Sequence, residues 1–223
     1  MEHDKLIKSS KMPVFFINQI DKSTKIGVWH ITETSVNLMD NYSLCCEEKS
    51  PINDFVHENR KKHWLSYRLL LRQMIPDSFN IEYDYTGKPL ITKNKEYEQV
   101  SISHSGEFAA VIISNRKKVG IDIEKISKRI EKVAAKFLCN EEQNFMNNDL
   151  RLDYLCVSWS AKEALYKVFG ADFYDFANQM LLKPFSLSDT GVIDAQLKNE
   201  GYSVHCLIHY QKIQDYFLSY VIC

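Results

Sequence analysis

The chain has 223 residues, of which 45% are hydrophobic and 26% are charged, with seven glycines and five prolines. These are ordinary globular values, and they argue against a disordered, collagen-like or coiled-coil protein. The formal charge of −1 supplies no global basic field, so we expect no nucleic-acid partner, and any anionic ligand must be bound by a local patch.

Cysteine usage and the start of the chain predict its compartment. None of the six cysteines belongs to a C-x-x-C pair: Cys45, Cys46, Cys139, Cys156, Cys206 and Cys223. This pattern is typical of free thiols in a reducing compartment rather than of a disulfide frame or zinc site. The apolar stretch from Met12 to Ile17 is too short for a signal peptide, and no apolar run approaches the roughly 18 residues of a membrane span. We therefore expect a cytoplasmic protein with no membrane partner.

The first half of the chain predicts a strand, a helix start, a long helix, a turn and a hairpin. In order these are Gly27–Ile31, Leu44, Glu58–Ile75, Gly87–Pro89 and a hairpin that opens at Ser101–Ser105 and continues through Ala109–Ser114. Apolar residues recur at helical spacing in the long segment, and Pro76 ends it because proline cannot continue a helix.

The second half predicts a similar series. In order these are a strand at Val119–Glu124, a helix start at Leu138, a helix over Leu155–Phe169 and a hairpin from Tyr202 that continues through Tyr216–Ile222. Gly170 is placed to cap the helix at its C-terminal end.

Four segments of the two halves match in the same order, at offsets of 93, 94, 95 and 101 residues. The matches start at Gly27 and Gly120, at Leu44 and Leu138, at Trp64 and Trp159, and at Ser101 and Tyr202. Either two α+β segments of similar length align by chance, or the chain is a duplicated pseudo-dimer. On the second interpretation we expect an α+β fold of two similar α/β halves, 1–115 and 116–223. Each half would have a small, mainly antiparallel sheet packed on helices, with the site in the cleft between the halves.

The segment Gly120–Glu124 places two acids on one face of a strand. Alternation directs Asp122 and Glu124 to the same side, and Ile121 and Ile123 into the core. Two adjacent carboxylates repel unless a cation or water separates them, and Mg²⁺ prefers such oxygen ligands together with substrate phosphates. A solvated acidic strand face is the alternative.

A second candidate lies in the helix that contains Trp159–Lys167. Glu163 and Lys167 are four residues apart and share one helix face. They form either an ordinary surface pair or, because bulky apolar residues surround them in sequence, a partly desolvated pair with a functional role.

The segment Ser101–Ser105 does not predict a hydrolase. Ser103 and His104 are neighbours on a strand and point to opposite faces, so they cannot form a nucleophile–base pair, and no G-x-S-x-G elbow occurs. His104 either contacts a phosphate or is a structural histidine. No P-loop or G-x-G-x-x-G motif is present.

Together these motifs resemble the 4′-phosphopantetheinyl transferases of the surfactin-synthetase-activating type. The two family signatures stand as Gly120–Glu124 and Trp159–Lys167, and Gly87–Pro89 and Ser101–Ser105 resemble two further elements in the expected order. The resemblance spans roughly residues 25 to 222. It implies a pseudo-dimer with coenzyme A bound between the halves, and transfer of the phosphopantetheine group to a serine of an apo acyl or peptidyl carrier protein.

The resemblance also implies roles for individual residues. Asp122, Glu124 and Glu163 would hold Mg²⁺ against the pyrophosphate of coenzyme A. Glu163 and Lys167 would be catalytic, with Glu163 as the base that takes the proton of the carrier serine. A metal-bound carboxylate is a poorer base, so its role as a ligand has the stronger basis. The implied substrate-binding residues are Lys62, Lys88, Ser103, His104 and Lys162.

The repeat predicts one active site per chain. Glu163 and Lys167 align with Arg68 and Arg72, while Asp122 and Glu124 align with Trp29 and Ile31. We therefore expect a monomer that needs no partner copy to complete its site. Ser101 departs from the asparagine usual in the family, and His63 stands where some members have a basic residue.

Two other functions remain open at this stage. One is a different Mg²⁺-dependent transferase or hydrolase that acts on a nucleotide diphosphate. The other is a non-catalytic module that binds coenzyme A or a carrier protein. A basic segment follows the acidic strand and is interpreted either as a docking patch for an acidic carrier helix or as a solvated face. It contains Lys125, Lys128, Arg129, Lys132 and Lys136.

Overall fold

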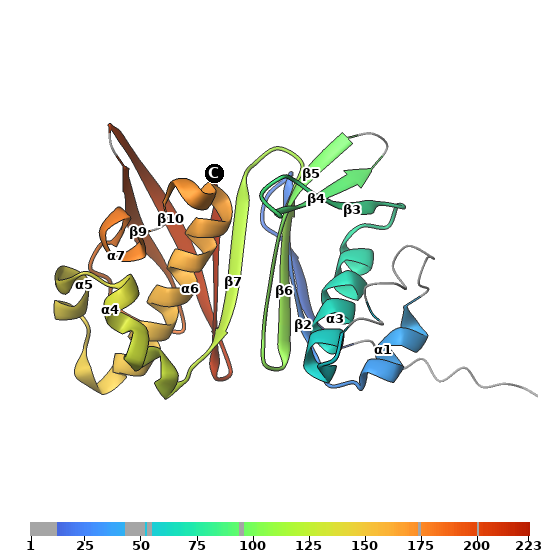
Figure 1. The fold of residues 1–223 in the computed structure, drawn as a ribbon, viewed down its shortest axis with the longest axis horizontal. Helices are drawn as coiled ribbons and strands as arrows, with labels where there is room; N and C mark the ends of the chain where they lie inside the picture. The colour runs from blue at the N-terminus through green and yellow to red at the C-terminus, as the bar shows by residue number, and fades with distance from the viewer. Residues whose placement is uncertain (1–12, 43–51, 53–54, 94–95, 174, 200) are drawn as a thin grey trace, which may run out of the picture.

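The computed structural model describes residues 13–42, 52, 55–93, 96–173, 175–199 and 201–223. They form two antiparallel sheets flanked by helices (Figure 1). The α+β class predicted from the sequence is therefore confirmed. The expected helix start at Leu44 and the residues Cys45 and Cys46 lie outside the described residues.

The first sheet has six strands in the order β1-β2-β6-β5-β4-β3. Its strands are β1 (Val14–Gln19), β2 (Thr24–His30), β3 (Asn80–Tyr83), β4 (Pro89–Lys93), β5 (Glu96–Ser105) and β6 (Phe108–Ser114). Helices α1 (Ser35–Asn41) and α3 (Glu58–Met74) belong to the same half. The predicted long helix is thus confirmed to within one residue, with Ile75 as its C-cap.

The second sheet has five strands in the order β7-β11-β10-β9-β8. Its strands are β7 (Val119–Lys125), β8 (Met180–Leu182), β9 (Thr190–Asn199), β10 (Tyr202–Ile213) and β11 (Tyr216–Ile222). Its helices are α4 (Ala134–Phe137), α5 (Asn140–Asn144), α6 (Arg151–Phe169) and α7 (Phe176–Gln179). Helix α6 begins four residues before the predicted start, and Gly170 caps it at a φ of 71°.

The two halves have the same topology. In each, a strand leads into the long helix and then into four further strands, and the sheet orders β2-β6-β5-β4-β3 and β7-β11-β10-β9-β8 correspond strand for strand. The matched segments at Gly27 and Gly120 lie in β2 and β7, and those at Trp64 and Trp159 lie in α3 and α6. The expected pseudo-dimer is confirmed, with β1 as an additional edge strand of the first half.

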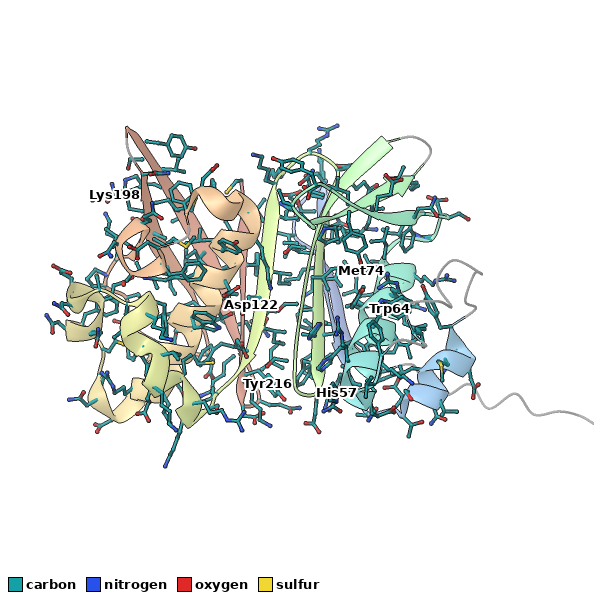
Figure 2. The ribbon with its side chains drawn as sticks, viewed as in Figure 1. His57, Trp64, Met74, Asp122, Lys198 and Tyr216 are labelled. Atoms are coloured by element: carbon teal, nitrogen blue, oxygen red, sulfur yellow. The ribbon has the colours of Figure 1, made fainter. Side chains whose placement is uncertain are left out.

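Three buried clusters connect these elements as four layers, α3, first sheet, second sheet and α6 (Figure 1). One cluster packs α3 on the first sheet and another packs α6 on the second. The third lies between the sheets and joins Val28 and Ala110 to Ile121, Ile123 and other residues of the second sheet. Asp122 therefore lies on β7 near the centre of the molecule (Figure 2).

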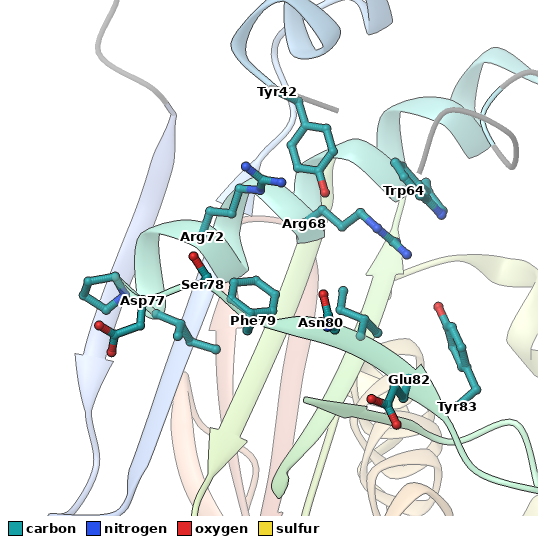
Figure 3. Close-up of a pocket in the computed structure, with 13 residues that line it drawn as sticks. Tyr42, Trp64, Arg68, Arg72, Asp77, Ser78, Phe79, Asn80, Glu82 and Tyr83 are labelled. Carbon is teal, nitrogen blue, oxygen red and sulfur yellow. The ribbon is translucent and has the colours of Figure 1, made fainter. Parts of the chain in front are cut away.

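The halves differ at the helix positions that the repeat equates. Arg68 and Arg72 of α3 stand where α6 has Glu163 and Lys167, and they line a cavity of about 750 Å³ beside β3 (Figure 3). The Arg68 guanidinium lies 3.6 Å from the centre of the Trp64 ring, and that of Arg72 lies 4.3 Å from the Tyr42 ring. This cavity contains none of the acidic residues predicted for the site.

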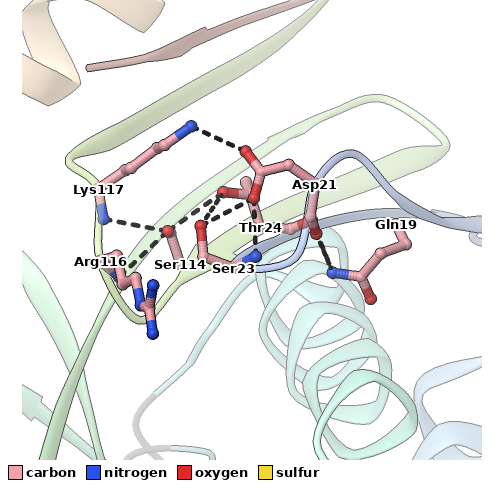
Figure 4. Close-up of polar contacts among 7 residues, drawn as sticks. All are labelled: Gln19, Asp21, Ser23, Thr24, Ser114, Arg116 and Lys117. Atoms are coloured by element: carbon pink, nitrogen blue, oxygen red, sulfur yellow. Dashed lines mark hydrogen bonds and ion pairs between the residues drawn. The ribbon is translucent and has the colours of Figure 1, made fainter.

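A short connection, 115–118, links the two sheets, and polar contacts fix it (Figure 4). Ser114 Oγ accepts hydrogen bonds from the backbone N–H groups of Arg116 and Lys117, at 3.4 and 3.1 Å. Lys117 Nζ lies 2.9 Å from Asp21 in the β1–β2 turn. This lysine and the Ser23 hydroxyl hold the pKa of Asp21 well below its ordinary value. The position of β7 relative to the first sheet is thus set at the start of the strand.

No helix among the described residues is long and apolar enough to cross a membrane.

The glycine of the Gly120–Glu124 motif permits α6 to approach β7 closely. A Cβ atom on Gly120 would lie 2.0 Å from the Ala164 carbonyl oxygen, which belongs to the helix backbone. At the equivalent Gly27, a Cβ would lie 2.8 Å from Met74 Sδ, the end of a flexible side chain. A side chain at position 120 would therefore collide with helix backbone, whereas one at position 27 would meet a side chain that can move.

We predict that Gly120→Ala lowers the free energy of unfolding more than Gly27→Ala does. Overpacking in a core costs about 1–3 kcal/mol, and the Gly120 variant should reach or exceed the upper end because backbone must move. Urea denaturation of the two variants beside the wild-type protein measures the difference. Equal losses of unfolding free energy would mean that moving α6 on β7 costs no more than moving the Met74 side chain at Gly27.

Candidate active site

The acidic face of β7 packs toward α6. Asp122 is buried, with 5% of its surface exposed, and Glu124 is half-buried, whereas Ile121 and Ile123 enter the core between the sheets. The predicted alternation is therefore confirmed, and the fully solvated alternative is wrong for Asp122. Helix α6 is held on this strand by Ser160 Oγ, which donates to the Asp122 carbonyl oxygen at 3.2 Å.

Glu163 and Lys167 of α6 lie beside the acids of β7. Lys167 Nζ is 2.8 Å from Asp122 Oδ1 and donates to the Ile121 carbonyl oxygen at the same distance. Burial, assisted by the charges of Asp122 and Glu124, raises the pKa of Glu163 to about 7, although Lys167 opposes the shift. The pair is thus partly desolvated and is not an ordinary surface pair.

One oxygen of Asp122 is fully engaged and the other is not. Oδ1 accepts hydrogen bonds from Ser103 Oγ at 2.7 Å and from Lys167 Nζ at 2.8 Å. Oδ2 is buried without a hydrogen-bond partner in the structure. A buried carboxylate oxygen without a donor is costly, and a cation at this position would satisfy it.

The donor set suits a divalent cation, although the side chains do not form a complete site as they stand. Asp122, Glu124 and Glu163 supply the carboxylate oxygens that Mg²⁺ prefers, and each of the two glutamates has its pKa raised by burial and then by the charge of Asp122. Among the described residues, no three His, Cys, Asp or Glu side chains are arranged so that they could hold a metal ion.

Two cavities meet at His104, beside this cluster. The smaller one, of about 340 Å³, is lined by Ser103, His104, Lys167 and four others, Tyr67, Tyr83, Pro89 and Ile102. The larger one, of about 690 Å³, is lined by His57, Glu58, Asn59, Arg60, His63 and His104. Together they extend from Lys167 of the second half, which contacts Asp122, to the start of α3 in the first half.

His104 is neutral in this setting. Desolvation of the ring and the neighbouring His63 lower its pKa to about 4, although the residue as a whole is exposed at the surface. The rings of His63 and His104 stack with their centres 4.3 Å apart, and His63 Nε2 lies 2.8 Å from the Gly106 carbonyl oxygen. A neutral imidazole can still donate one N–H to an anion.

The remaining predicted lysines occupy the first half. Lys88, in the turn before β4, is half-buried, and its pKa is lowered by burial and by Lys118. Its neighbour Pro89 lines the smaller cavity. Lys62, on α3, is half-buried and near enough to Glu58 to lower the pKa of that acid. Both lie close to the edges of the two cavities rather than among the lining residues.

Lys162 does not join the site, and its predicted role in binding substrate is corrected. Its side chain is 0% exposed and forms an ion pair with Glu142, itself 2% exposed, with 2.7 Å between Nζ and Oε1. Nζ also donates to the carbonyl oxygens of Phe137 and Phe176 at 2.7 and 2.9 Å. Its donors are therefore saturated inside the second half, where a substrate cannot reach them.

The five residues of the basic segment are all exposed, as both of its interpretations require. Lys125 ends β7, and Lys128, Arg129 and Lys132 lie on a single 3₁₀ turn.

Sequence reasoning missed several residues of the site. Tyr67 and Tyr83 line the smaller cavity, but nothing in their sequence context connects them with His104. The Trp159 side chain is within hydrogen-bonding reach of Glu124 and lowers its pKa. Ser105 donates to Glu124 Oε2 at 2.8 Å. The alternation of serines at 101, 103 and 105 was the available signal for the last of these.

Comparisons with known proteins show which proteins the chain is similar to. The sequence model of the 4′-phosphopantetheinyl transferase superfamily matches residues 118–221. The 4′-phosphopantetheinyl transferase AcpT of Escherichia coli is 30% identical over 145 residues, which cover 63% of this chain and 72% of AcpT.

Vertebrate relatives match over a similar length. The L-aminoadipate-semialdehyde dehydrogenase-phosphopantetheinyl transferase of Xenopus laevis is 32% identical over 146 residues, and that of Homo sapiens is 26% identical over 150. These matches cover 56% and 57% of this chain, and the chain spans about half (48%) of the length of each of the two relatives.

We predict that Lys162→Met is strongly destabilising because it leaves the Glu142 carboxylate buried without its counter-charge. Breaking one partner of a buried pair costs about 3–5 kcal/mol. The double variant Lys162→Met/Glu142→Gln should recover part of that loss, since the amide oxygen can still accept from the backbone. Denaturant unfolding measures both variants. A Lys162→Met protein with wild-type stability and lost substrate binding would restore the substrate-binding role.

Proposed function

The chain belongs to the 4′-phosphopantetheinyl transferase superfamily, and on this premise we propose that it modifies an apo acyl or peptidyl carrier protein. The reaction transfers the 4′-phosphopantetheine group of coenzyme A to a carrier serine and releases 3′,5′-ADP. The observation that carries the proposal is the cluster of three carboxylates and Lys167 beside the cavity of Ser103 and His104. We assign the protein to the surfactin-synthetase-activating type, because its two halves lie within one chain.

The two functional halves are 1–115 and 116–223, with coenzyme A between them. The cavities that meet at His104 are lined mainly by the first half and reach Lys167 of the second. The acids of β7 and α6 have no acidic counterparts at the equivalent positions of the first half. One site per chain follows, and a monomer is sufficient for activity.

Asp122, Glu124 and Glu163 would hold the Mg²⁺ ion, since their oxygens form the acidic cluster and Asp122 Oδ2 is buried without a donor. A bound Mg²⁺ would offset negative charge on the pyrophosphate and on the departing 3′,5′-ADP. Lys167, now paired with Asp122, is placed to donate to phosphate oxygens on the same side.

The first half supplies the remaining contacts with coenzyme A. His104 and Ser103 line the smaller cavity and would donate to phosphates. Lys88 would reach the phosphate on the adenosine ribose, with Lys62 as a helper from α3. Phosphoryl-type transfer depends mainly on positioning and charge neutralisation, and these residues provide both.

In the chemical step the hydroxyl oxygen of the carrier serine forms a bond to the phosphorus that bears the pantetheine. The bond from that phosphorus to the oxygen of 3′,5′-ADP breaks, and the serine proton leaves to a base. Family resemblance assigns the base role to Glu163, directly or through a water. Its role as a ligand comes first, because metal coordination weakens a carboxylate as a base.

We predict that an apo carrier protein incubated with this protein, coenzyme A and Mg²⁺ gains one phosphopantetheine group, measured as intact mass. Glu163→Gln and chelation with EDTA should each abolish the gain, because both remove a component of the cation site. Coenzyme A binding without a mass gain on several carriers would favour the non-catalytic binding module. Release of a nucleotide product without any carrier would favour the alternative transferase or hydrolase.

We predict that coenzyme A raises the pKa of His104 from its value near 4, because a phosphate beside the ring favours the imidazolium. Proton–carbon NMR of the ring, assigned with His104→Gln, measures the shift. Adenosine, which has no phosphates, should leave the pKa unchanged. A pKa unaffected by coenzyme A would remove His104 from the phosphate-binding residues.

His104 also makes the free energy of unfolding depend on pH. Its pKa in the folded protein lies below the ordinary 6.5, so the unfolded chain binds the proton more readily between these values. Its contribution to the free energy of unfolding is therefore present above about 6.5 and is lost as pH falls toward 4.

A further inference from the structure

Three serines at alternate positions of β5 face β7 across the junction of the halves. We name Ser101, Ser103 and Ser105 the serine ladder. Because alternate residues of a strand share a face, all three hydroxyls point to the same side. Each of them makes a hydrogen bond to β7, and together they follow the strand from Ile121 to Lys125.

The serine ladder occupies the side of β7 where a further strand would otherwise pair. β7 is an edge strand of the second sheet, and among the described strands it pairs with β11 alone. The backbone N–H of Ile121 donates to Ser101 Oγ at 3.0 Å, and that of Lys125 donates to Ser105 Oγ at 3.3 Å. Side chains of the first sheet thus accept from backbone groups at the edge of β7, and the Ile121 N–H among them is buried.

Two rungs of the ladder also reach carboxylates. Ser103 donates to Asp122 Oδ1, and Ser105 donates to Glu124 Oε2 at 2.8 Å. Ser101 contacts only the backbone of β7. The serine ladder therefore contains two kinds of serine. Ser101 contacts backbone alone, whereas Ser103 and Ser105 each donate to a carboxylate.

Glu124 is held from both halves. Ser105 reaches it from the first sheet, and Trp159 reaches it from α6. Ser105 Oγ can donate to the carboxylate while it accepts from the Lys125 N–H, so both capacities of one hydroxyl are used at this point.

We propose that Ser105 is a positioning residue, whose hydroxyl restrains Glu124 near Asp122 and Glu163, so that small side-chain movements suffice for the three carboxylates to share one divalent cation. The inference rests on the proposed function, since it concerns the same cation site. A donor that orients a metal ligand affects cation affinity and turnover more than it affects the fold. Loss of such a donor typically lowers metal affinity or activity by about 10–100-fold.

The test compares Ser105→Ala with Ser101→Ala. Each removes one hydroxyl of the ladder and one backbone contact, but only Ser105→Ala releases a carboxylate. We expect Mn²⁺, titrated into the full-length protein and followed by electron paramagnetic resonance, to bind Ser105→Ala about 10-fold or more weakly. Ser101→Ala should bind Mn²⁺ like the wild type, while its melting temperature falls by about as much as that of Ser105→Ala.

Two further variants separate positioning from packing. Ser105→Thr keeps the donor and should restore the Mn²⁺ affinity and the kcat of carrier modification. If Ser105→Ala does not fold, Ser105→Cys replaces it with the same expectation, because a thiol fills the space but donates weakly. With Ser105→Ala, kcat should fall while KM for the carrier protein is unchanged.

The outcomes distinguish this inference from the proposed function. Equal Mn²⁺ affinity in the wild type and Ser105→Ala, with carrier modification intact, overturns the inference alone. Equal losses of affinity in Ser101→Ala and Ser105→Ala also overturn it, because the effect would then belong to the junction as a whole. A wild-type protein that neither binds Mn²⁺ nor modifies a carrier overturns the inference together with the proposed function.

Discussion

The contact between β7 and β5 is the constraint on which the rest of the structure depends. β7 belongs to the second sheet through β11, yet its other side is satisfied by side chains of the first sheet. Its apolar residues Ile121 and Ile123 fill the core between the sheets, and the acids at alternate positions then face α6. Any rotation of β7 would lose both the core and the acidic cluster, so the packing of the halves and the chemistry of the site share one strand.

The site holds like charges close together, which is electrostatically unfavourable, and the surrounding packing keeps them there. Three carboxylates lie near one another in a partly buried space, and desolvation, followed by the charge of Asp122, raises the pKa of both Glu124 and Glu163. Lys167 and Ser103 compensate one oxygen of Asp122, while the other oxygen keeps no donor. The close contact of α6 and β7, which Gly120 permits and the Ser160 hydrogen bond supports, keeps this arrangement in place. The arrangement favours a ligand that brings positive charge to the carboxylates, such as a divalent cation.

Features with a short sequence period could be predicted, and features that need tertiary register could not. The period of two placed Asp122 and Glu124 on one face, and the period of the helix placed Glu163 and Lys167 together. The duplicated topology was visible in four collinear matches. Lys162 was misassigned because its partner, Glu142, lies 20 residues earlier in a separate helix, and no local pattern relates the two. Ser105 was likewise missed as a partner of Glu124, since its role depends on how β5 of one half meets β7 of the other.

The asymmetry of the halves explains why a duplicated fold has a single acidic site. β2 has a neighbour on each side, β1 and β6, whereas β7 pairs with β11 alone in the part of the chain that the structure describes. The open side of β7 is therefore available to the serine ladder, and its acids can be fixed by groups from the other half. At the equivalent positions, Trp29 is buried in the first core, and Arg68 and Arg72 stack on aromatic rings. The second half thus has a charged junction and the first half has an additional strand, β1. The cavities at His104 lie on the side of the charged junction, because β5 and Lys167 line them and β1 does not.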